Sequence, residues 1–227
     1  VLSDHKNAGN EVILVSSGAI AMGVSKLSLE RRPSDIPTKQ AAAAVGQCEL
    51  MYTYDKFFGE YNQTVAQILL TAEVVESAER RTHFENTLER LLQLGAVPVI
   101  NENDTIATKE IAVGDNDTLA AIGAVSVGAD LLVLLTDIDG LYTGDPRRDE
   151  GARHIPVVEE LTPELFAAAG GSGTSLGTGG MCTKLQAAQM CMQSGMDMVI
   201  AKGSDPAVLY EITEGKGAGT RFKGKKE

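Results

Sequence analysis

The sequence contains no tryptophan, and aromatic residues make up only 4% of its 227 residues. It also lacks an apolar run of about 18 residues or more, so it predicts no membrane-spanning helix. His5, Lys6 and Asn7 interrupt the start, so we expect no secretory signal peptide there. Basic residues are fewer than acidic ones, 20 against 31, and the net charge of -11 argues against nucleic acid as a general partner.

Cysteine is scarce too. Cys48, Cys182 and Cys191 are odd in number and do not have the spacing of a metal site, so we assign no metal ligands. We expect three reduced thiols in a cytoplasmic protein.

Apolar residues are plentiful, at 43%, which is enough for one large domain or two closely associated lobes. Short apolar runs alternate with helical patterns. The runs cover residues 11–16, 65–70, 97–100, 131–135 and 198–201, and the helical patterns cover 38–58, 77–94, 117–127 and 183–194. This alternation predicts an α/β protein, a three-layer α/β/α sandwich with a mainly parallel central sheet.

Polar clusters follow several of the predicted strands, at the ends where such sheets bind ligands. Ser17 and Gly18 follow the first strand, and a hydroxyl with free N–H groups there suits an anion or caps a helix. The stretch 101–104, Asn-Glu-Asn-Asp, suits a ligand ammonium group or forms a capped turn. The stretch 115–117, Asp-Asn-Asp, precedes a predicted helix and holds more capping residues than one helix needs, which favours a functional role.

The stretch 178–184, Thr-Gly-Gly-Met-Cys-Thr-Lys, is the most informative motif. Its glycines let the backbone approach an anion, the helix that follows presents free N–H groups, and Lys184 adds a positive charge. These features predict a binding site for the terminal phosphates of a nucleotide, although the spacing between the glycines and Lys184 is not that of a Walker motif. The alternative is a flexible turn capped by Thr183.

Seven stretches together resemble the glutamate 5-kinase branch of the amino-acid kinase family. They occur in order over nearly the whole chain, and are VSSGAIAMG (15–23), QAAAAVGQ (40–47), QILLT (67–71), VPVINENDT (97–105), GDNDTLAA (114–121), LLTDIDGLYTGDPR (134–147) and GTGGMCTK (177–184).

The resemblance implies ATP-dependent phosphorylation of the side-chain carboxylate of L-glutamate, the first step of proline biosynthesis, with Mg²⁺ accompanying ATP. It implies an acceptor-binding lobe at about 1–128 and a nucleotide-binding lobe at about 129–227. It implies glutamate contacts by Ser17, Asp104 and Asn116, and catalytic roles for Lys184 and for Asp117, which organises the catalytic lysines. The nucleotide contacts that it implies are Thr136, Asp137, Thr178, Gly179, Gly180, Met181, Cys182, Thr183 and Lys184.

The same resemblance implies a homo-oligomer, inhibition by proline and an association with γ-glutamyl phosphate reductase. Two departures from the family pattern stand out. The chain opens at what resembles the helix after a first strand that carries a lysine, so we expect that strand to be missing. It stops soon after residue 222, so we also expect the C-terminal RNA-binding-like module of many members to be absent. The missing lysine leaves an alternative open, a catalytically idle relative that binds glutamate or proline as a regulatory or assembly subunit.

Overall fold

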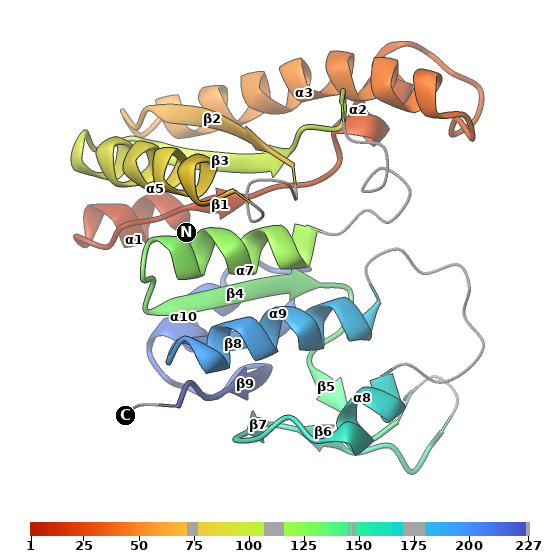
Figure 1. Ribbon diagram of the computed structural model, residues 1–227, viewed down its shortest axis with the longest axis vertical. Coiled ribbons are helices and arrows are strands. Elements are labelled where there is room, and N and C mark those ends of the chain that lie inside the picture. Colours follow the sequence, from red (N-terminus) through yellow and green to blue (C-terminus); the bar gives the residue numbers. More distant parts are fainter. Residues whose placement is uncertain (72–76, 107–115, 145, 147–148, 170–179, 226–227) are drawn as a thin grey trace. The chain divides into compact units, whose positions relative to one another are not determined.

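The protein is described by a computed structural model that covers residues 1–227 except 72–76, 107–115, 145, 147–148, 170–179 and 226–227. The chain divides into a first unit, residues 2–119, and a second unit, residues 120–227, with which Val1 is grouped. Each unit has its own sheet (Figure 1). Among the described residues, no helix combines the length and the apolar composition that a bilayer crossing requires.

The first unit alternates helices and strands along the chain. Its elements are α1 (Leu2–Asn7), β1 (Leu14–Val15), α2 (Ala19–Lys26), α3 (Ile36–Gly59), β2 (Val65–Leu70), α5 (Ala78–Gln93), β3 (Val97–Glu102) and the start of α7 (Asn116–Ser126). Two helix starts have side-chain caps: Asp35 accepts a hydrogen bond from the backbone N–H of Thr38 (2.9 Å), and Ser77 accepts one from that of Arg80 (3.3 Å). These caps satisfy N–H groups that have no partner within a helix, and so define where α3 and α5 begin.

The three strands of the first unit are parallel and ordered β1-β3-β2. Because the chain passes from β1 to β2 and then back to β3, right-handed crossovers place α3 and α5 on opposite faces of the sheet (Figure 1). α3 packs against β2, and α5 packs against β3. The first five residues of β3 are all buried, the pattern of a central parallel strand that is covered on both faces.

The second unit contains a four-stranded sheet and a short hairpin. Its elements after α7 are β4 (Leu131–Thr136), β5 (Leu141–Tyr142), β6 (His154–Ile155), β7 (Val157–Val158), α8 (Pro163–Ala169), α9 (Met181–Gln193), β8 (Asp197–Lys202), α10 (Val208–Thr213) and β9 (Thr220–Phe222). The strand order is β4-β8-β9-β7, with β4 and β8 parallel and β9 antiparallel to β8. α9 and α10 pack against β8, and Ile212 of α10 joins Val199 and Ala201 of β8 in the core.

The predicted α/β class with mainly parallel strands is confirmed, while several boundaries differ. The first strand is only Leu14–Val15, because these two residues alone pair with β3. The helix predicted from residue 183 begins at Met181, so Lys184 lies inside its first turns. The sequence did not predict α8, α10, β5, β6, β7 or β9, all of which are too short, at two to seven residues, to show a clear periodicity.

Helices α2 and α3 cross with their backbones in contact. A Cβ atom on Gly23 of α2 would overlap the carbonyl oxygen of Ala42, and one on Gly46 of α3 would overlap that of Ala19. Only glycine fits at these two positions. The crossing therefore fixes α2, and with it the turn that follows β1, to α3.

We expect Gly46→Ala to lower the free energy of unfolding by about 1–3 kcal/mol or more, because the added methyl group must push two helix backbones apart. Gly59→Ala is the matched control, since Gly59 ends the same helix and a Cβ atom there meets only open space. We expect the control to be neutral or to stabilise by up to about 1 kcal/mol. Urea denaturation measures both, and equal effects would contradict the proposed contact.

Candidate active site

The predicted acceptor residues gather where β1 and β3 end and α7 begins, all within the first unit. The side-chain amide of Asn116 donates two hydrogen bonds, to the carbonyl oxygen of Ser16 (2.9 Å) and to Oδ1 of Asn101 (3.2 Å). Ser16 immediately precedes Ser17, and Asn101 lies three residues before Asp104. Asn116 is thus held between the two strand ends that carry the other predicted glutamate contacts.

The capping alternative holds for Gly18 but not for the Ser17 hydroxyl, because no side-chain hydrogen bond caps this helix start. The N-cap of α2 is Gly18, at φ 100°, a left-handed conformation that glycine adopts readily. The Ser17 side chain is exposed. Ser17 remains a candidate ligand group beside the start of α2.

The stretch after β3 forms the predicted turn, and its role toward a ligand ammonium group stays a prediction. Asn103 is a turn residue, because its side chain accepts a hydrogen bond from the Thr105 hydroxyl (2.6 Å) and its carbonyl oxygen one from the Ile106 N–H (3.1 Å). Asp104 is half-buried in this turn. Burial raises the pKa of the Asp104 carboxyl, and a side-chain hydrogen bond with Glu102 opposes the shift.

We expect Asp104→Asn to raise the melting temperature at pH 7 by about 1–3 °C while raising the KM for L-glutamate. The folded-state pKa lies above the ordinary value of 3.8, so the ionised carboxylate costs stability that the amide does not. This stability cost is absent at pH values below 3.8, and it develops as the pH rises through the folded-state pKa of Asp104. The difference in melting temperature between the variant and the unmodified protein should therefore shrink as the pH falls toward 4. A lower melting temperature for the variant at pH 7 would contradict this prediction.

The predicted nucleotide contacts lie in the second unit, at the carboxyl end of β4 and the amino end of α9. Thr136 ends β4, and its hydroxyl donates a hydrogen bond to the Asp137 carboxylate (3.1 Å). The carbonyl oxygen of Thr136 accepts a hydrogen bond from the Gly203 N–H (2.8 Å), which joins this end of β4 to that of β8. The carboxyl end of β4 and the amino end of α9 lie at the same end of the unit (Figure 1).

The glycine-rich motif is described only in part, because Thr178 and Gly179 lie outside the described residues. Gly180 is the N-cap of α9 and offers no capping side chain, so Met181, Cys182 and Thr183 form the first turn. The Thr183 hydroxyl donates a hydrogen bond to the carbonyl oxygen of Gly180 (2.8 Å), at the start of the same helix. Lys184 follows in α9 and is buried, with 8% of its surface exposed.

The three thiols differ in access: Cys48 and Cys182 are exposed, whereas Cys191 is buried. Burial raises the pKa of the Cys191 thiol to about 12, so at pH 8 roughly one such thiol in 10⁴ is ionised. We expect iodoacetamide at pH 8 to label Cys48 and Cys182 but not Cys191 in the folded protein.

Magnesium-ATP should protect Cys182 and leave Cys48 unprotected, if the amino end of α9 holds the phosphates. Peptide mass spectrometry gives the three labelling rates. Cys48 is the internal control, and equal protection of Cys48 and Cys182 would contradict a phosphate site at α9.

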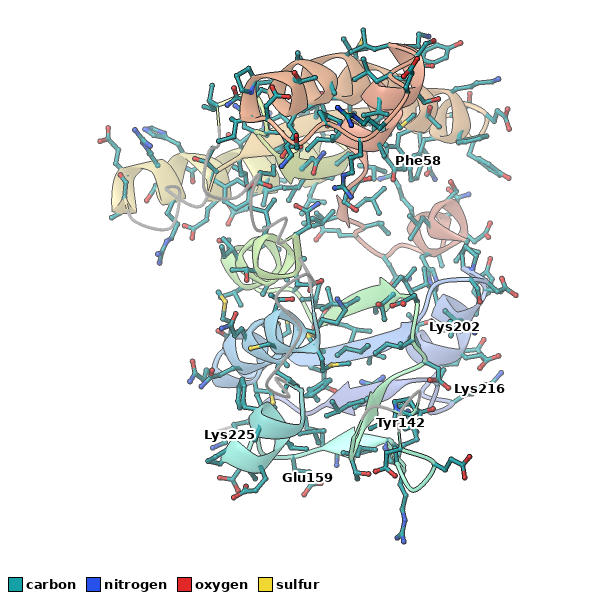
Figure 2. The ribbon with its side chains drawn as sticks, turned by 90° about the vertical axis from the view of Figure 1, so that its right-hand side faces the viewer. Phe58, Tyr142, Glu159, Lys202, Lys216 and Lys225 are labelled. Atoms are coloured by element: carbon teal, nitrogen blue, oxygen red, sulfur yellow. The ribbon has the colours of Figure 1, made fainter. Side chains whose placement is uncertain are left out.

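Two residues that the sequence did not single out join these sites. Lys202, which is labelled in Figure 2, is exposed. It is the register partner of Thr136 in the parallel β4-β8 pair, so it places a positive charge beside a predicted nucleotide contact. Gln47 of α3 is buried and hydrogen-bonds Asn101. Strand register would have found Lys202, and Gln47 ends the stretch QAAAAVGQ (40–47) that carries part of the family resemblance, but nothing in that stretch indicates its hydrogen bond to Asn101.

Asp117 lies half-buried in the first turn of α7, next to Asn116. A carboxylate at this position is favourable, because the amino end of a helix carries partial positive charge. Its predicted role toward the catalytic lysines stays a prediction. Asp115, which belongs to the same motif, lies outside the described residues.

Residues 1–202 match the model of the amino acid kinase family, and the chain belongs to this family. The glutamate 5-kinase of Clostridium perfringens is 50% identical over 230 residues, covering 100% of this chain and 86% of that protein. The glutamate 5-kinase of Listeria welshimeri is 51% identical over 231 residues, covering 100% of this chain and 84% of that protein. The uridylate kinase of Archaeoglobus fulgidus has a similar fold, with a TM-score of 0.59 at 18% identity, covering 97% of this chain and 90% of that one.

Proposed function

We infer that the protein catalyses the ATP-dependent phosphorylation of the side-chain carboxylate of L-glutamate, giving γ-glutamyl phosphate and ADP, the first step of proline biosynthesis. The observation that carries this inference is the identity of about 50% with glutamate 5-kinases over the whole chain. The polar groups at the ends of β1 and β3 and at the start of α7 agree with it, since they suit an amino acid. The resemblance to these enzymes gives no support to the idle alternative.

We propose that Ser17, Asp104 and Asn116 bind L-glutamate, and that residues 1–128 act as the acceptor-binding part of the chain. Three features support this: the exposed Ser17 hydroxyl, the partly buried Asp104 carboxyl and the two hydrogen bonds that fix Asn116. The carboxylate of Asp104 suits the α-ammonium group of the substrate, which would offset the cost of burying its charge.

We propose that residues 129–227 bind ATP through Thr136, Asp137 and the stretch 178–184. The amino end of α9 supports a phosphate site, because backbone N–H groups there point toward an anion. Lys184 in the same helix would stabilise the charge that develops on the transferred phosphoryl group, and Asp117 would orient the cationic groups. Lys202 is a further candidate contact of the nucleotide.

The chemistry needs no general base. The side-chain carboxylate of glutamate has a pKa of about 4.3 and is already ionised at neutral pH. One of its oxygens attacks the γ-phosphorus of ATP, the bond from that phosphorus to the β,γ-bridging oxygen breaks, and ADP leaves with the electron pair. The protein has to bring two anions together, which requires positioning and positive charge.

Magnesium is expected to arrive with ATP. Mg²⁺ usually keeps several waters and binds through one or two carboxylates together with substrate phosphates. The described residues contain no group of three or more His, Cys, Asp or Glu side chains that could hold a metal by themselves. We therefore expect the nucleotide phosphates to provide most of the ligands of Mg²⁺, and the bound ion would neutralise part of the phosphate charge.

Further expectations rest on the family resemblance: a homo-oligomer in the cytoplasm, competition by proline at the glutamate site, and an association with γ-glutamyl phosphate reductase. The function itself is tested by ADP release that depends on L-glutamate. Hydroxylamine would trap the acyl phosphate as a hydroxamate, which distinguishes the reaction from simple ATP hydrolysis. ADP formation that is indifferent to L-glutamate would overturn the proposed function.

We expect Lys184→Ala to lower kcat by about 10²–10³-fold with little change in L-glutamate binding, because the ammonium group acts mainly on charge that develops during transfer. Lys223→Ala is the control, since Lys223 is an exposed lysine paired with Glu159 (2.9 Å). Steady-state kinetics and calorimetric titration with L-glutamate check both variants. Turnover near that of the unmodified protein in Lys184→Ala would remove the assigned role.

A further inference from the structure

Four side-chain amides form one hydrogen-bonded chain inside the first unit. The Gln47 amide donates to Oε1 of Gln67 (3.1 Å), the Asn101 amide donates to Oε1 of Gln47 (2.9 Å), and the Asn116 amide donates to Oδ1 of Asn101 (3.2 Å). The four residues come from β2, α3, β3 and α7, so the chain of bonds runs across the sheet to the start of α7.

Backbone groups fix the direction of every amide in this chain. The N–H of Glu102, which can only donate, bonds Oδ1 of Asn101 (2.8 Å). The carbonyl oxygen of Ser16, which can only accept, bonds the amide nitrogen of Asn116 (2.9 Å). With Asn101 oriented in this way its nitrogen must donate to Gln47, and Gln47 in turn must donate to Gln67.

Burial keeps these orientations in place. Asn101 and Gln47 are 2% and 8% exposed, so water cannot replace a lost partner at low cost. Helix α3 supports both acceptors of Asn116, because Tyr54, two turns after Gln47, has its hydroxyl 2.7 Å from that of Ser16. The position of Asn116 therefore depends on α3, although none of its own hydrogen bonds goes to α3.

The orientation of Asn116 decides which group of a ligand it can bind. Its amide has two hydrogens, and Ser16 and Asn101 accept both. The carbonyl oxygen is left as the group for a ligand, and it can only accept a hydrogen bond. L-glutamate at neutral pH has one donor group, its α-ammonium, since both carboxylates are ionised.

We propose that Gln47 is a positioning residue that sets the selectivity of the acceptor site for an α-ammonium group. Through Asn101 it keeps Asn116 turned so that the carbonyl oxygen faces the substrate. Without Gln47 the buried amide nitrogen of Asn101 has no acceptor, so the Asn101 side chain shifts. Asn116 is then held by the Ser16 carbonyl oxygen alone, and its own carbonyl oxygen moves out of line with the ammonium group. The inference rests on the proposed function, because it assigns L-glutamate to Asn116.

The test compares L-glutamate with glutarate, the same five-carbon dicarboxylate without the amino group. Two quantities are measured, the KM for L-glutamate and the inhibition constant of glutarate against it, and neither depends on the amount of active protein. For Gln47→Met, which keeps the side-chain length, we expect the KM for L-glutamate to rise about tenfold. The inhibition constant of glutarate and the KM for ATP should each change less than about twofold.

Gln63→Met is the matched control. Gln63 is a glutamine of the same unit with 7% exposure, but it bonds the carbonyl oxygen of Ser3 (3.3 Å) and Oδ1 of Asn7 (3.0 Å) instead of this chain. We expect both constants to stay unchanged in this variant.

Gln47→Glu is the conservative replacement. It keeps an acceptor for the Asn101 amide, and Gln67 can turn its own amide so that it donates to the new carboxylate. The KM for L-glutamate should therefore stay within about threefold of that of the unmodified protein.

Three results would count against the inference. A parallel rise of the L-glutamate and glutarate constants in Gln47→Met would indicate general loss of the site, and no change in either would show that Gln47 has no influence. If Gln47→Met does not fold, Gln47→Glu decides alone, and a tenfold rise in its KM would overturn the inference. If the unmodified protein shows no glutamate-dependent ADP release, the proposed function is overturned together with the role of Gln47. If the unmodified protein is active and Gln47→Met keeps its selectivity, only the role of Gln47 is overturned.

Discussion

The need to satisfy buried amide groups is the constraint on which the first unit depends. β3 is buried along its first five residues, so a polar side chain near its end must find protein partners in place of water. Asn101 finds three: the Glu102 N–H, Asn116 and Gln47. The bonds that make burial of Asn101 acceptable also hold the start of α7 against the ends of β1 and β3. The interactions that stabilise the fold here are thus the same ones that we propose to orient the ligand.

Charge imposes the second constraint. A protein with a net charge of -11 that binds an anionic nucleotide must concentrate positive charge where the phosphates lie. In the second unit the proposed sources of this charge are a buried lysine within α9 and an exposed one at the end of β8. The backbone N–H groups at the amino end of α9 add partial charge that no titration can remove.

The sequence predicted what is local and missed what depends on long-range contacts. Apolar runs that end in polar residues identified the strands β3 and β4, and they marked the ends of these strands as candidate ligand sites, because burial and exposure alternate within a few residues. Gln47 and Asn101 are 54 positions apart, and nothing in either neighbourhood signals their hydrogen bond. Lys202 became a candidate only when the register of β4 and β8 placed it beside Thr136. The glycines of the α2-α3 crossing likewise have no signature until the two helices meet.

The crossing of α2 and α3 has a consequence for how this protein can evolve. Gly46 and Gln47 are neighbours in the sequence, yet successive helix positions point about 100° apart, so one contacts α2 while the other reaches the sheet. A rotation of α3 that made room for a larger residue at position 46 would also move Gln47 away from its hydrogen-bond partners in the sheet. Neutral drift at these two codons is therefore restricted. A lineage that acquires a different acceptor has more freedom to change exposed or half-buried positions such as Ser17 and Asp104 than to change the helix behind them.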